Sequence, residues 1–185
     1  MSKKCIFVLG GARSGKSQFA QELAGKLGNK VLFVATGEAR DEDMHARIAQ
    51  HQKDRPKSWR TLEAPTKLGK QIEKKALDAQ VVIIDCLTLL VSNLLGDNPD
   101  YAKVEKKVIS EIKHLVACMD KLNPTFIVVS NEVGLGLVPE NKLGRTYRDL
   151  MGKVNRIIAQ HADEVYLMVA GMPVSVKKEQ RRRKP

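Results

Sequence analysis

The chain has 185 residues, 43% of them hydrophobic and 4% aromatic, and it carries a formal net charge of +11. This length suits one compact domain with its own core, and no apolar run reaches the ~20 residues that a membrane-spanning helix needs. The low aromatic content argues against a surface that stacks nucleic-acid bases, whereas the positive charge is compatible with attracting polyphosphates.

Apolar runs of strand length alternate with amphipathic runs of helical length along the chain. In chain order we predict strand Cys5–Leu9, helix Lys16–Leu27, strand Lys30–Ala35, helix Asp41–Asp54, a short extended piece Ser58–Glu63, helix Thr66–Leu77, strand Gln80–Asp85, helix Tyr101–Leu122, strand Thr125–Ser130, helix Leu143–His161, strand Asp163–Val169 and a short strand Val174–Val176. The strands are too apolar to have a face in water. The pattern therefore predicts an α/β fold with helices on both faces of a mostly parallel sheet, and a short antiparallel strand at its C-terminal end.

We divide the chain into a nucleotide-binding catalytic domain over residues 1–176 and a basic tail over residues 177–185. The tail carries six positive charges and one negative charge, which is typical of a solvated, disordered end whose nucleic-acid contacts would be non-specific. The three cysteines, Cys5, Cys86 and Cys118, are too few and too scattered for a disulfide framework. With no secretory signal pattern at the N-terminus, we expect a cytoplasmic protein in which all three are reduced and buried.

The strongest motif is a glycine-rich octapeptide between the first strand and the first helix. It consists of Gly10, Gly11, Ala12, Arg13, Ser14, Gly15, Lys16 and Ser17, which is the full Gly-x4-Gly-Lys-Ser pattern. Backbone N–H groups of such a loop, with the positive end of the following helix, bind the phosphates of a nucleotide. Lys16 would reach the β- and γ-phosphates, and the Ser17 hydroxyl would bind Mg2+. The motif predicts a P-loop NTPase of the RecA-like type that works on a purine nucleoside triphosphate.

Two further sets of polar residues follow predicted strands. Asp85 ends a run of four apolar residues, so its carboxylate is expected at the carboxyl edge of the sheet, where it would hold Mg2+ directly or through water. The alternative role for Asp85 is to cap a helix that starts at Leu87. Ser130, Asn131 and Glu132 end another strand at the same edge. There they either face the γ-phosphate or the acceptor, or they serve the turn.

Of the four histidines, His51 alone shares a helix face with apolar residues. Met44, Ile48, His51 and Arg55 follow i, i+4, i+7 and i+11 spacing on the predicted helix Asp41–Asp54 and its end. Spacing alone favours a packed, hydrogen-bonded histidine. A neutral imidazole close to a nucleotide could instead attack the α-phosphorus and form a phosphoramidate, and periodicity does not choose between these roles.

At this point the motifs resemble those of a known family, the bifunctional adenosylcobinamide kinase / adenosylcobinamide-phosphate guanylyltransferases of cobalamin biosynthesis. The similarity runs from residue 5 to about residue 176. The matching stretches are residues 10–17, Val34–Gly37, Arg47–His51, Arg55-Pro56, Trp59–Glu63, Asp85–Thr88, Asn93–Leu95, Ser130–Gly134, Val138–Asn141 and Arg145.

The resemblance implies two activities. A nucleoside triphosphate, ATP or GTP, phosphorylates adenosylcobinamide, and GMP is then transferred from GTP to adenosylcobinamide phosphate through a guanylylated histidine. His51 occupies the matching position and Gln50 precedes it, where some members carry a second histidine. The family's nucleotide contacts would fall on the 10–17 loop, Ala35, Thr36, Gly37, Gln52, Lys53, Asp54, Arg55, Glu63 and Asp85. The resemblance also implies a homotrimer with sites between subunits.

Two other functions stay open from the sequence. One is a small-molecule or nucleotide kinase without guanylyl transfer. The other is a RecA-like ATPase that binds nucleic acid, which the positive charge suggests and the low aromatic content disfavours.

Overall fold

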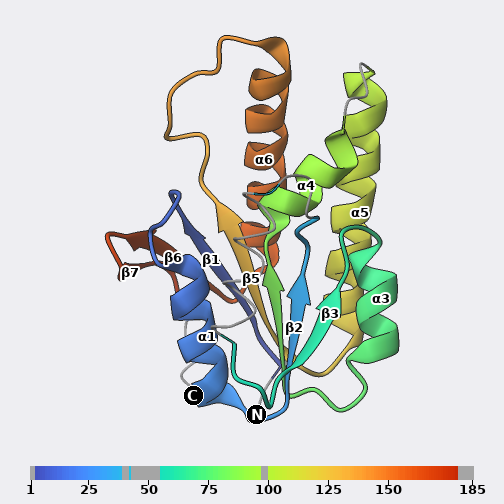
Figure 1. Ribbon diagram of the computed structural model, residues 1–185, viewed down its shortest axis with the longest axis vertical. Helices are drawn as coiled ribbons and strands as arrows, with labels where there is room; N and C mark the ends of the chain where they lie inside the picture. The colour runs from blue at the N-terminus through green and yellow to red at the C-terminus, as the bar shows by residue number, and fades with distance from the viewer. Residues whose placement is uncertain (1–2, 39–41, 43–54, 97–99, 179–185) are drawn as a thin grey trace, which may run out of the picture.

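The computed structural model describes residues 3–38, 42, 55–96 and 100–178 (Figure 1). Over these residues the elements are β1 (Cys5–Gly10), α1 (Lys16–Leu27), β2 (Val31–Ala35), β3 (Arg60–Glu63), α3 (Leu68–Lys75), β4 (Val81–Asp85), α4 (Leu87–Leu95), α5 (Tyr101–Lys121), β5 (Thr125–Asn131), α6 (Lys142–His161), β6 (Glu164–Val169) and β7 (Met172–Lys177).

The strands form one sheet in the order β3-β2-β4-β5-β1-β6-β7. Every neighbouring pair is parallel except β6 and β7, which are antiparallel. The predicted α/β fold with a mostly parallel sheet and an antiparallel C-terminal strand is therefore confirmed. Because the first six strands run the same way, their carboxyl ends meet at one edge, the upper edge in Figure 1.

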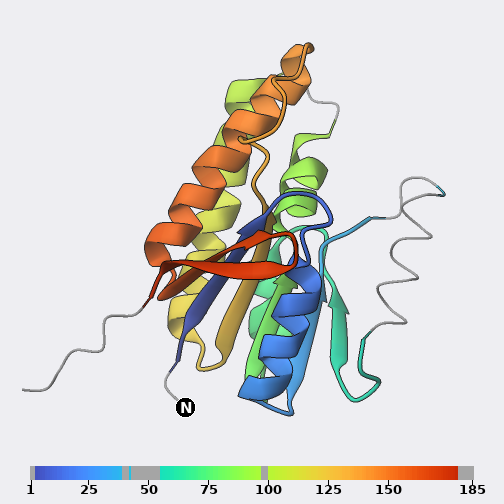
Figure 2. The ribbon, with the colours of Figure 1, turned by 90° about the vertical axis from the view of Figure 1, so that its left-hand side faces the viewer.

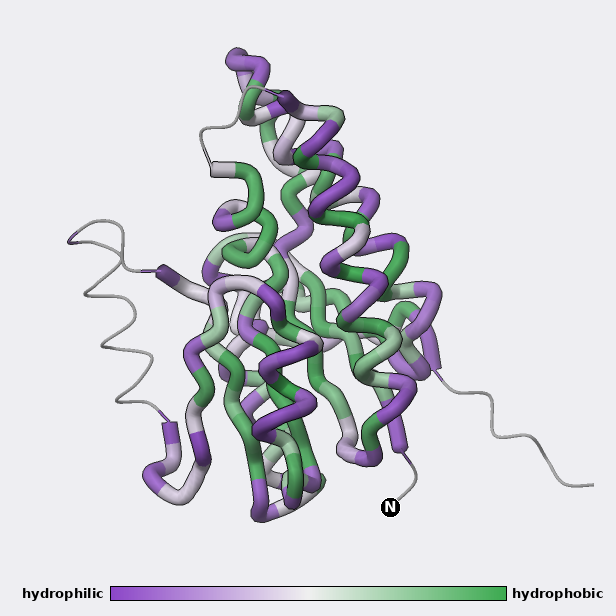
Figure 3. Tube along the Cα trace, turned by 90° about the vertical axis from the view of Figure 1, so that its right-hand side faces the viewer, coloured by the Kyte–Doolittle hydropathy of each residue, from purple (hydrophilic) through white to green (hydrophobic). Residues whose placement is uncertain are grey.

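Helices cover both faces of the sheet, and each face has its own hydrophobic core. Strand residues such as Phe7, Ile84 and Phe126 pack with α3, α4, α5 and α6 on one face. Their neighbours along the strands, such as Phe33 and Ile83, pack with α1 on the other face. Figure 3 shows hydrophobic residues along the central strands and mixed polarity along the outer helices. Strands buried on both faces are what the continuous apolar runs predict.

The two long helices begin at residues whose side chains cap them. Asp100 accepts a hydrogen bond from the Lys103 N–H at 3.0 Å, and Asn141 accepts one from the Gly144 N–H at 2.7 Å. Both caps satisfy backbone donors that a helix leaves unpaired at its first turn. The capping side chains therefore set where these helices start, and the apolar residues of both helices pack into the core on one face of the sheet.

Helix α4 is absent from the predicted elements. Its residues Leu87–Leu95 are apolar almost all round, and six of the nine are buried. An amphipathic period is missing because α4 packs against β5 and against both helices α5 and α6. The cap of α4 is Cys86, so Asp85 is not the residue that caps this helix.

Two predicted segments are not covered by the structure. The predicted helix Asp41–Asp54 falls, apart from Glu42, outside the described residues, as do residues 179–185 of the basic tail. Lys177 is the last residue of β7, and its ammonium group donates to the carbonyls of Ala159, Gln160 and Ala162. Strand β7 thus ends one residue after the predicted strand Val174–Val176.

Two further expectations concern burial and membranes. Cys5 and Cys118 are buried, whereas Cys86 is only partly buried because it lies at the carboxyl edge of the sheet. None of the helices in the described parts of the chain is long and apolar enough to cross a membrane.

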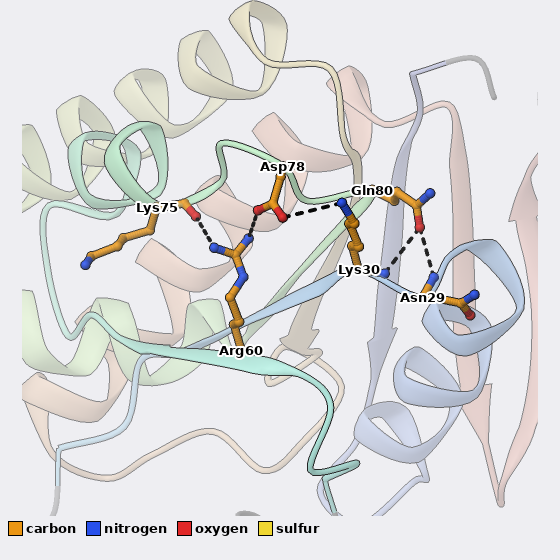
Figure 4. A network of polar contacts seen from close by, with 6 residues as sticks. All are labelled: Asn29, Lys30, Arg60, Lys75, Asp78 and Gln80. Atoms are coloured by element: carbon orange, nitrogen blue, oxygen red, sulfur yellow. Dashed lines mark hydrogen bonds and ion pairs between the residues drawn. The ribbon is translucent and has the colours of Figure 1, made fainter.

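An exposed polar network links the starts of strands β2, β3 and β4 at the amino edge of the sheet (Figure 4). Asp78 binds the Arg60 guanidinium at 2.6 Å and the Lys30 ammonium at 3.7 Å. The side-chain oxygen of Gln80 accepts from the backbone N–H groups of Asn29 and Lys30 at 2.9 and 3.2 Å. Exposed ion pairs contribute only about 0–1 kcal/mol each, so this network ties strand ends together without dominating stability.

Candidate active site

The glycine-rich octapeptide joins β1 to α1 at the carboxyl edge of the sheet. Gly10 ends β1, and Gly15 precedes the first residue of α1 with a φ of 90°. A Cβ on Gly10 would lie 2.5 Å from the Ser14 hydroxyl oxygen and 2.8 Å from the Met168 carbonyl oxygen, so no larger residue fits there. The first turn of α1 has no acidic residue to oppose an anion at the positive end of the helix.

Lys16 is the first residue of α1 and is only 8% exposed. Its ammonium group donates to the Gly11 carbonyl at 2.6 Å. Burial lowers the pKa of Lys16, and the neighbouring Cys86 and Asp85 oppose that shift. A buried ammonium gains from any anion that replaces its lost hydration, so this position favours a bound phosphate.

Strand pairing brings three predicted site residues side by side. Ala35 at the end of β2 lies opposite Glu63 at the end of β3 and opposite Asp85 at the end of β4. The Asp85 carboxylate is close enough to Lys16 and to Arg55 to affect the pKa of each. The residues predicted from β1, β2, β3 and β4 therefore lie together at one edge.

Thr36 links the chain after β2 to the start of α4. Its hydroxyl accepts from the Cys86 N–H at 2.8 Å and donates to the Cys86 carbonyl at 2.7 Å. The Thr36 N–H also donates to the Asp85 carbonyl at 3.2 Å. Thr36 is fully buried, so these bonds are made away from water and fix the backbone on either side of the Asp85–Cys86 bond.

Asn93 on α4 was not among the predicted site residues, yet it holds the same junction. Its side-chain amide donates to the carbonyls of Thr36 at 2.7 Å and Pro65 at 3.1 Å. One amide thereby joins the segments that follow β2 and β3. Two signals in the sequence mark Asn93: it is an amide inside a mostly apolar stretch, and it lies in one of the stretches that match the family. Neither signal shows its partners, which are far away along the chain.

Arg55 lies over the Phe33 ring, with its guanidinium carbon 3.8 Å from the ring centre. Burial lowers the pKa of Arg55, and Asp85 and Glu63 oppose that shift. Two of its nitrogens, Nε and one Nη, are buried without a hydrogen-bond partner among the described residues. Buried N–H donors of this kind are costly, so Arg55 presents donors that suit an acceptor supplied by a ligand.

A cavity of about 390 Å³ lies next to Arg55. It is lined by Arg55, Pro56, Lys57, Trp59, Thr61 and Glu63. The cavity therefore combines an aromatic ring, a carboxylate and two cations beside the ends of β2 and β3.

The polar residues at the end of β5 serve the packing of α6 and α4. The Ser130 hydroxyl is fully buried and donates to Asn155 Oδ1 at 2.7 Å, and the Asn155 amide donates to the Asn131 carbonyl at 3.1 Å. The Asn131 N–H donates to the Thr88 hydroxyl at 2.9 Å. The Ser130 hydroxyl therefore holds α6 against β5, which is neither of the two roles expected for this residue.

The predicted residues His51, Gln52, Lys53 and Asp54 lie outside the described residues. The remaining predicted residues, from the 10–17 loop to Ala35, Thr36, Gly37, Arg55, Glu63 and Asp85, lie in or next to the strand ends at the carboxyl edge.

The sequence model of the family described as cobinamide kinase / cobinamide phosphate guanyltransferase matches residues 6–176. The chain belongs to this family. The glycine-rich loop after β1 and the mostly parallel sheet are consistent with the P-loop NTPase fold of cobinamide kinase / cobinamide phosphate guanyltransferases.

Relatives in three bacteria cover almost the whole chain. The bifunctional adenosylcobalamin biosynthesis proteins CobU of Escherichia coli (strain K12) and of Salmonella typhimurium are each 41% identical over 180 residues, which cover 93% of this chain and 99% of each relative. The bifunctional adenosylcobalamin biosynthesis protein CobP of Pseudomonas aeruginosa is 41% identical over 173 residues, covering 93% of this chain and 96% of the relative.

The Thr36 junction gives a stability prediction. Replacing Thr36 with Val keeps its shape but leaves the Cys86 N–H without its hydrogen-bond partner, while the Cys86 carbonyl keeps the Leu90 N–H at 3.3 Å. The free energy of unfolding should therefore fall by about 1–3 kcal/mol. Thr36→Ser keeps the hydroxyl and should lose less. Urea denaturation of the three proteins measures this, and a Thr36→Val variant as stable as the parent would show that the bonds contribute nothing.

Proposed function

We propose that this protein phosphorylates adenosylcobinamide with a nucleoside triphosphate, ATP or GTP, and then transfers GMP from GTP to the product, giving adenosylcobinamide-GDP. The observation that carries the proposal is a complete phosphate-binding loop, with Lys16 buried beside Asp85, in a chain that matches the family over residues 6–176. Both reactions require the charge of a triphosphate to be neutralised and its leaving group to be held in line.

In this proposal different residues at the carboxyl edge bind different parts of the nucleotide. Backbone N–H groups of residues 10–17 and the Lys16 ammonium bind the phosphates. The rest of the nucleotide lies toward Arg55 and Glu63, where the cavity of about 390 Å³ offers buried N–H donors and the Trp59 ring. Gln52, Lys53 and Asp54 would complete this side, as the family resemblance implies.

We assign Mg2+ to Ser17 and Asp85. The described residues hold no group of three or more His, Cys, Asp or Glu side chains that could bind a metal alone. One hydroxyl and one carboxylate beside a phosphate loop nevertheless suit Mg2+, which takes oxygen ligands and usually binds through one or two carboxylates plus substrate phosphates. When bound, the ion would neutralise charge on the β- and γ-phosphate oxygens.

For guanylyl transfer we assign the nucleophile to His51. Its neutral imidazole would attack the α-phosphorus of GTP, so that a nitrogen–phosphorus bond forms while the bond to the bridging oxygen breaks and pyrophosphate leaves. An oxygen of adenosylcobinamide phosphate would then attack the same phosphorus and release the imidazole. Two easier steps replace one difficult displacement between two anions.

We further propose a homotrimer, as the family resemblance implies, with β7 at a subunit contact. β7 is the edge strand, and its Met172, Val174 and Val176 side chains are 63%, 50% and 64% exposed. Val169 on β6 extends this apolar row, and Leu135 and Leu137 are exposed in the loop that follows β5. Exposed apolar rows on an edge strand are typical of surfaces that another chain covers.

The guanylyl intermediate is tested with GTP labelled in its α-phosphate. After incubation and denaturation, the wild-type protein should retain acid-labile GMP, and His51→Ala should retain none because the nucleophile is gone. His114→Ala, on the exposed face of α5, is the matched control and should label normally. Label that survives in His51→Ala would exclude His51 as the carrier, and a wild-type protein that never labels would favour a plain kinase.

The phosphate and metal assignments are tested by two measurements, the affinity for GTP and the initial rate over a range of Mg2+ concentrations. Lys16→Ala should weaken GTP binding by roughly ten- to a hundredfold, because a charge-assisted contact to phosphate is lost. Asp85→Asn should instead raise the Mg2+ concentration needed for half-maximal rate. Gln18→Ala, next to the loop but exposed, should change neither quantity. A Lys16→Ala variant that binds GTP as well as the parent would overturn the assignment of the loop.

The assembly is tested by sedimentation equilibrium. The wild-type protein should have the mass of three chains, and Val174→Lys should shift the population toward monomer because it places a charge in the apolar row. Lys113→Ala on the exposed side of α5 is the control and should stay trimeric. A wild-type protein that sediments as a monomer at assay concentrations would contradict the proposal.

A further inference from the structure

The turn between β6 and β7 lies against the phosphate loop. The Gly171 N–H donates to the Ser14 carbonyl at 3.1 Å. Met168, just before this turn, pairs with Gly10 of β1, and a Cβ on Gly15 would lie 3.3 Å from the Gly171 Cα. Figure 2 shows the end of the β6–β7 hairpin beside the start of α1. The approach is close enough for the hairpin to influence the loop.

The phosphate loop is therefore held from both sides by backbone bonds. On the β5 side, the Glu132 N–H donates to the Gly10 carbonyl at 3.0 Å. On the hairpin side, the Gly171 N–H holds the Ser14 carbonyl. Neither bond involves a side chain, so the amino-acid types of the loop reveal neither contact.

The second of these bonds fixes the direction of one peptide group. A trans peptide is planar, and its carbonyl and N–H point in opposite directions. When the Ser14 carbonyl points at Gly171, the Gly15 N–H therefore points away from the hairpin. Gly15 is the N-cap of α1, so its N–H belongs to the group of donors at the positive end of the helix that bind phosphate. A rotated peptide would present a carbonyl oxygen in its place and repel the phosphates.

The turn itself depends on an unusual backbone conformation. Ala170 and Gly171 both have positive φ values, 49° and 83°, as in the type I′ turns of two-residue hairpins. A Cβ on Gly171 would meet nothing within 4 Å. A substitution at Gly171 therefore acts through the preferred backbone angles and not through a clash, which makes this residue a clean probe.

We propose that Gly171 is a positioning residue for the phosphate loop, because its N–H sets the orientation of the Ser14–Gly15 peptide and so the affinity for the phosphates of the nucleotide. The proposal rests on the proposed function only in that the loop binds a nucleoside triphosphate. It does not depend on the cobinamide substrate or on His51.

The test is a series at Gly171 in the full chain, with dissociation constants measured by calorimetry for GTP and for inorganic pyrophosphate. Asn tolerates positive φ, Ala does so poorly, and Val hardly at all. Affinity for both ligands should therefore fall in the order Gly, Asn, Ala, Val. The Val variant should lose roughly three- to tenfold, about the effect of one hydrogen bond.

Two control variants separate positioning from simple stability. Val165→Ala removes core packing on β6, on the face covered by α6, and should lower the free energy of unfolding while leaving the dissociation constants unchanged. Ala170→Gly eases the same turn and should bind GTP at least as tightly as the parent.

Equal affinities across the Gly171 series would overturn the proposal. The proposal would also be overturned if, in every variant including Val165→Ala, the affinity fell together with the free energy of unfolding. If the wild-type protein binds GTP but does not convert adenosylcobinamide, the proposed function fails and the Gly171 series still decides this inference. A wild-type protein that binds neither GTP nor pyrophosphate would overturn both.

Discussion

The buried ammonium group of Lys16 is the constraint around which the carboxyl edge of the sheet is arranged. Without a ligand it has the Gly11 carbonyl as a hydrogen-bond partner and the Asp85 and Cys86 groups nearby. That environment compensates only in part for lost hydration, since burial still lowers the pKa of Lys16. In the proposed function, a bound phosphate would compensate for the cost of keeping this cation inside, and the bracing of the loop by neighbouring elements would hold the binding groups in place.

That bracing comes from three directions, through backbone bonds to the loop and through side-chain bonds of Thr36 and Asn93. The segment that follows β5 contributes the Glu132 N–H, the β6–β7 turn contributes the Gly171 N–H, and Thr36 and Asn93 hold the strand ends next to Asp85. A rigid phosphate site suits a protein that performs two transfers from nucleotides, because the phosphates stay in place while the acceptor changes. Arg55, by contrast, has buried donors without a partner among the residues described, which suits the proposed place of the nucleoside beside it.

Much of this arrangement could be predicted from the sequence, because local patterns fix it. Helix α1 begins and ends at the predicted residues Lys16 and Leu27, since the loop motif marks its start and Gly28 follows its end. Asp85 was placed correctly at the carboxyl edge by the apolar run before it. Helix α4 could not be found from periodicity because it is apolar on all sides. Asn93 and Gly171 act on backbone atoms far away along the chain, and no pattern in the residue types records such contacts.

The hairpin that contacts the phosphate loop also carries the exposed apolar edge strand, and this has a thermodynamic consequence. A partner that packs on β7 and shifts the turn changes the energy of the phosphate site. Linkage is reciprocal, so bound nucleotide must change the affinity for that partner by the same factor. For a second copy of this chain, the concentration at which subunits separate would depend on GTP, and occupancy of one site would be communicated to the oligomer through the β6–β7 hairpin.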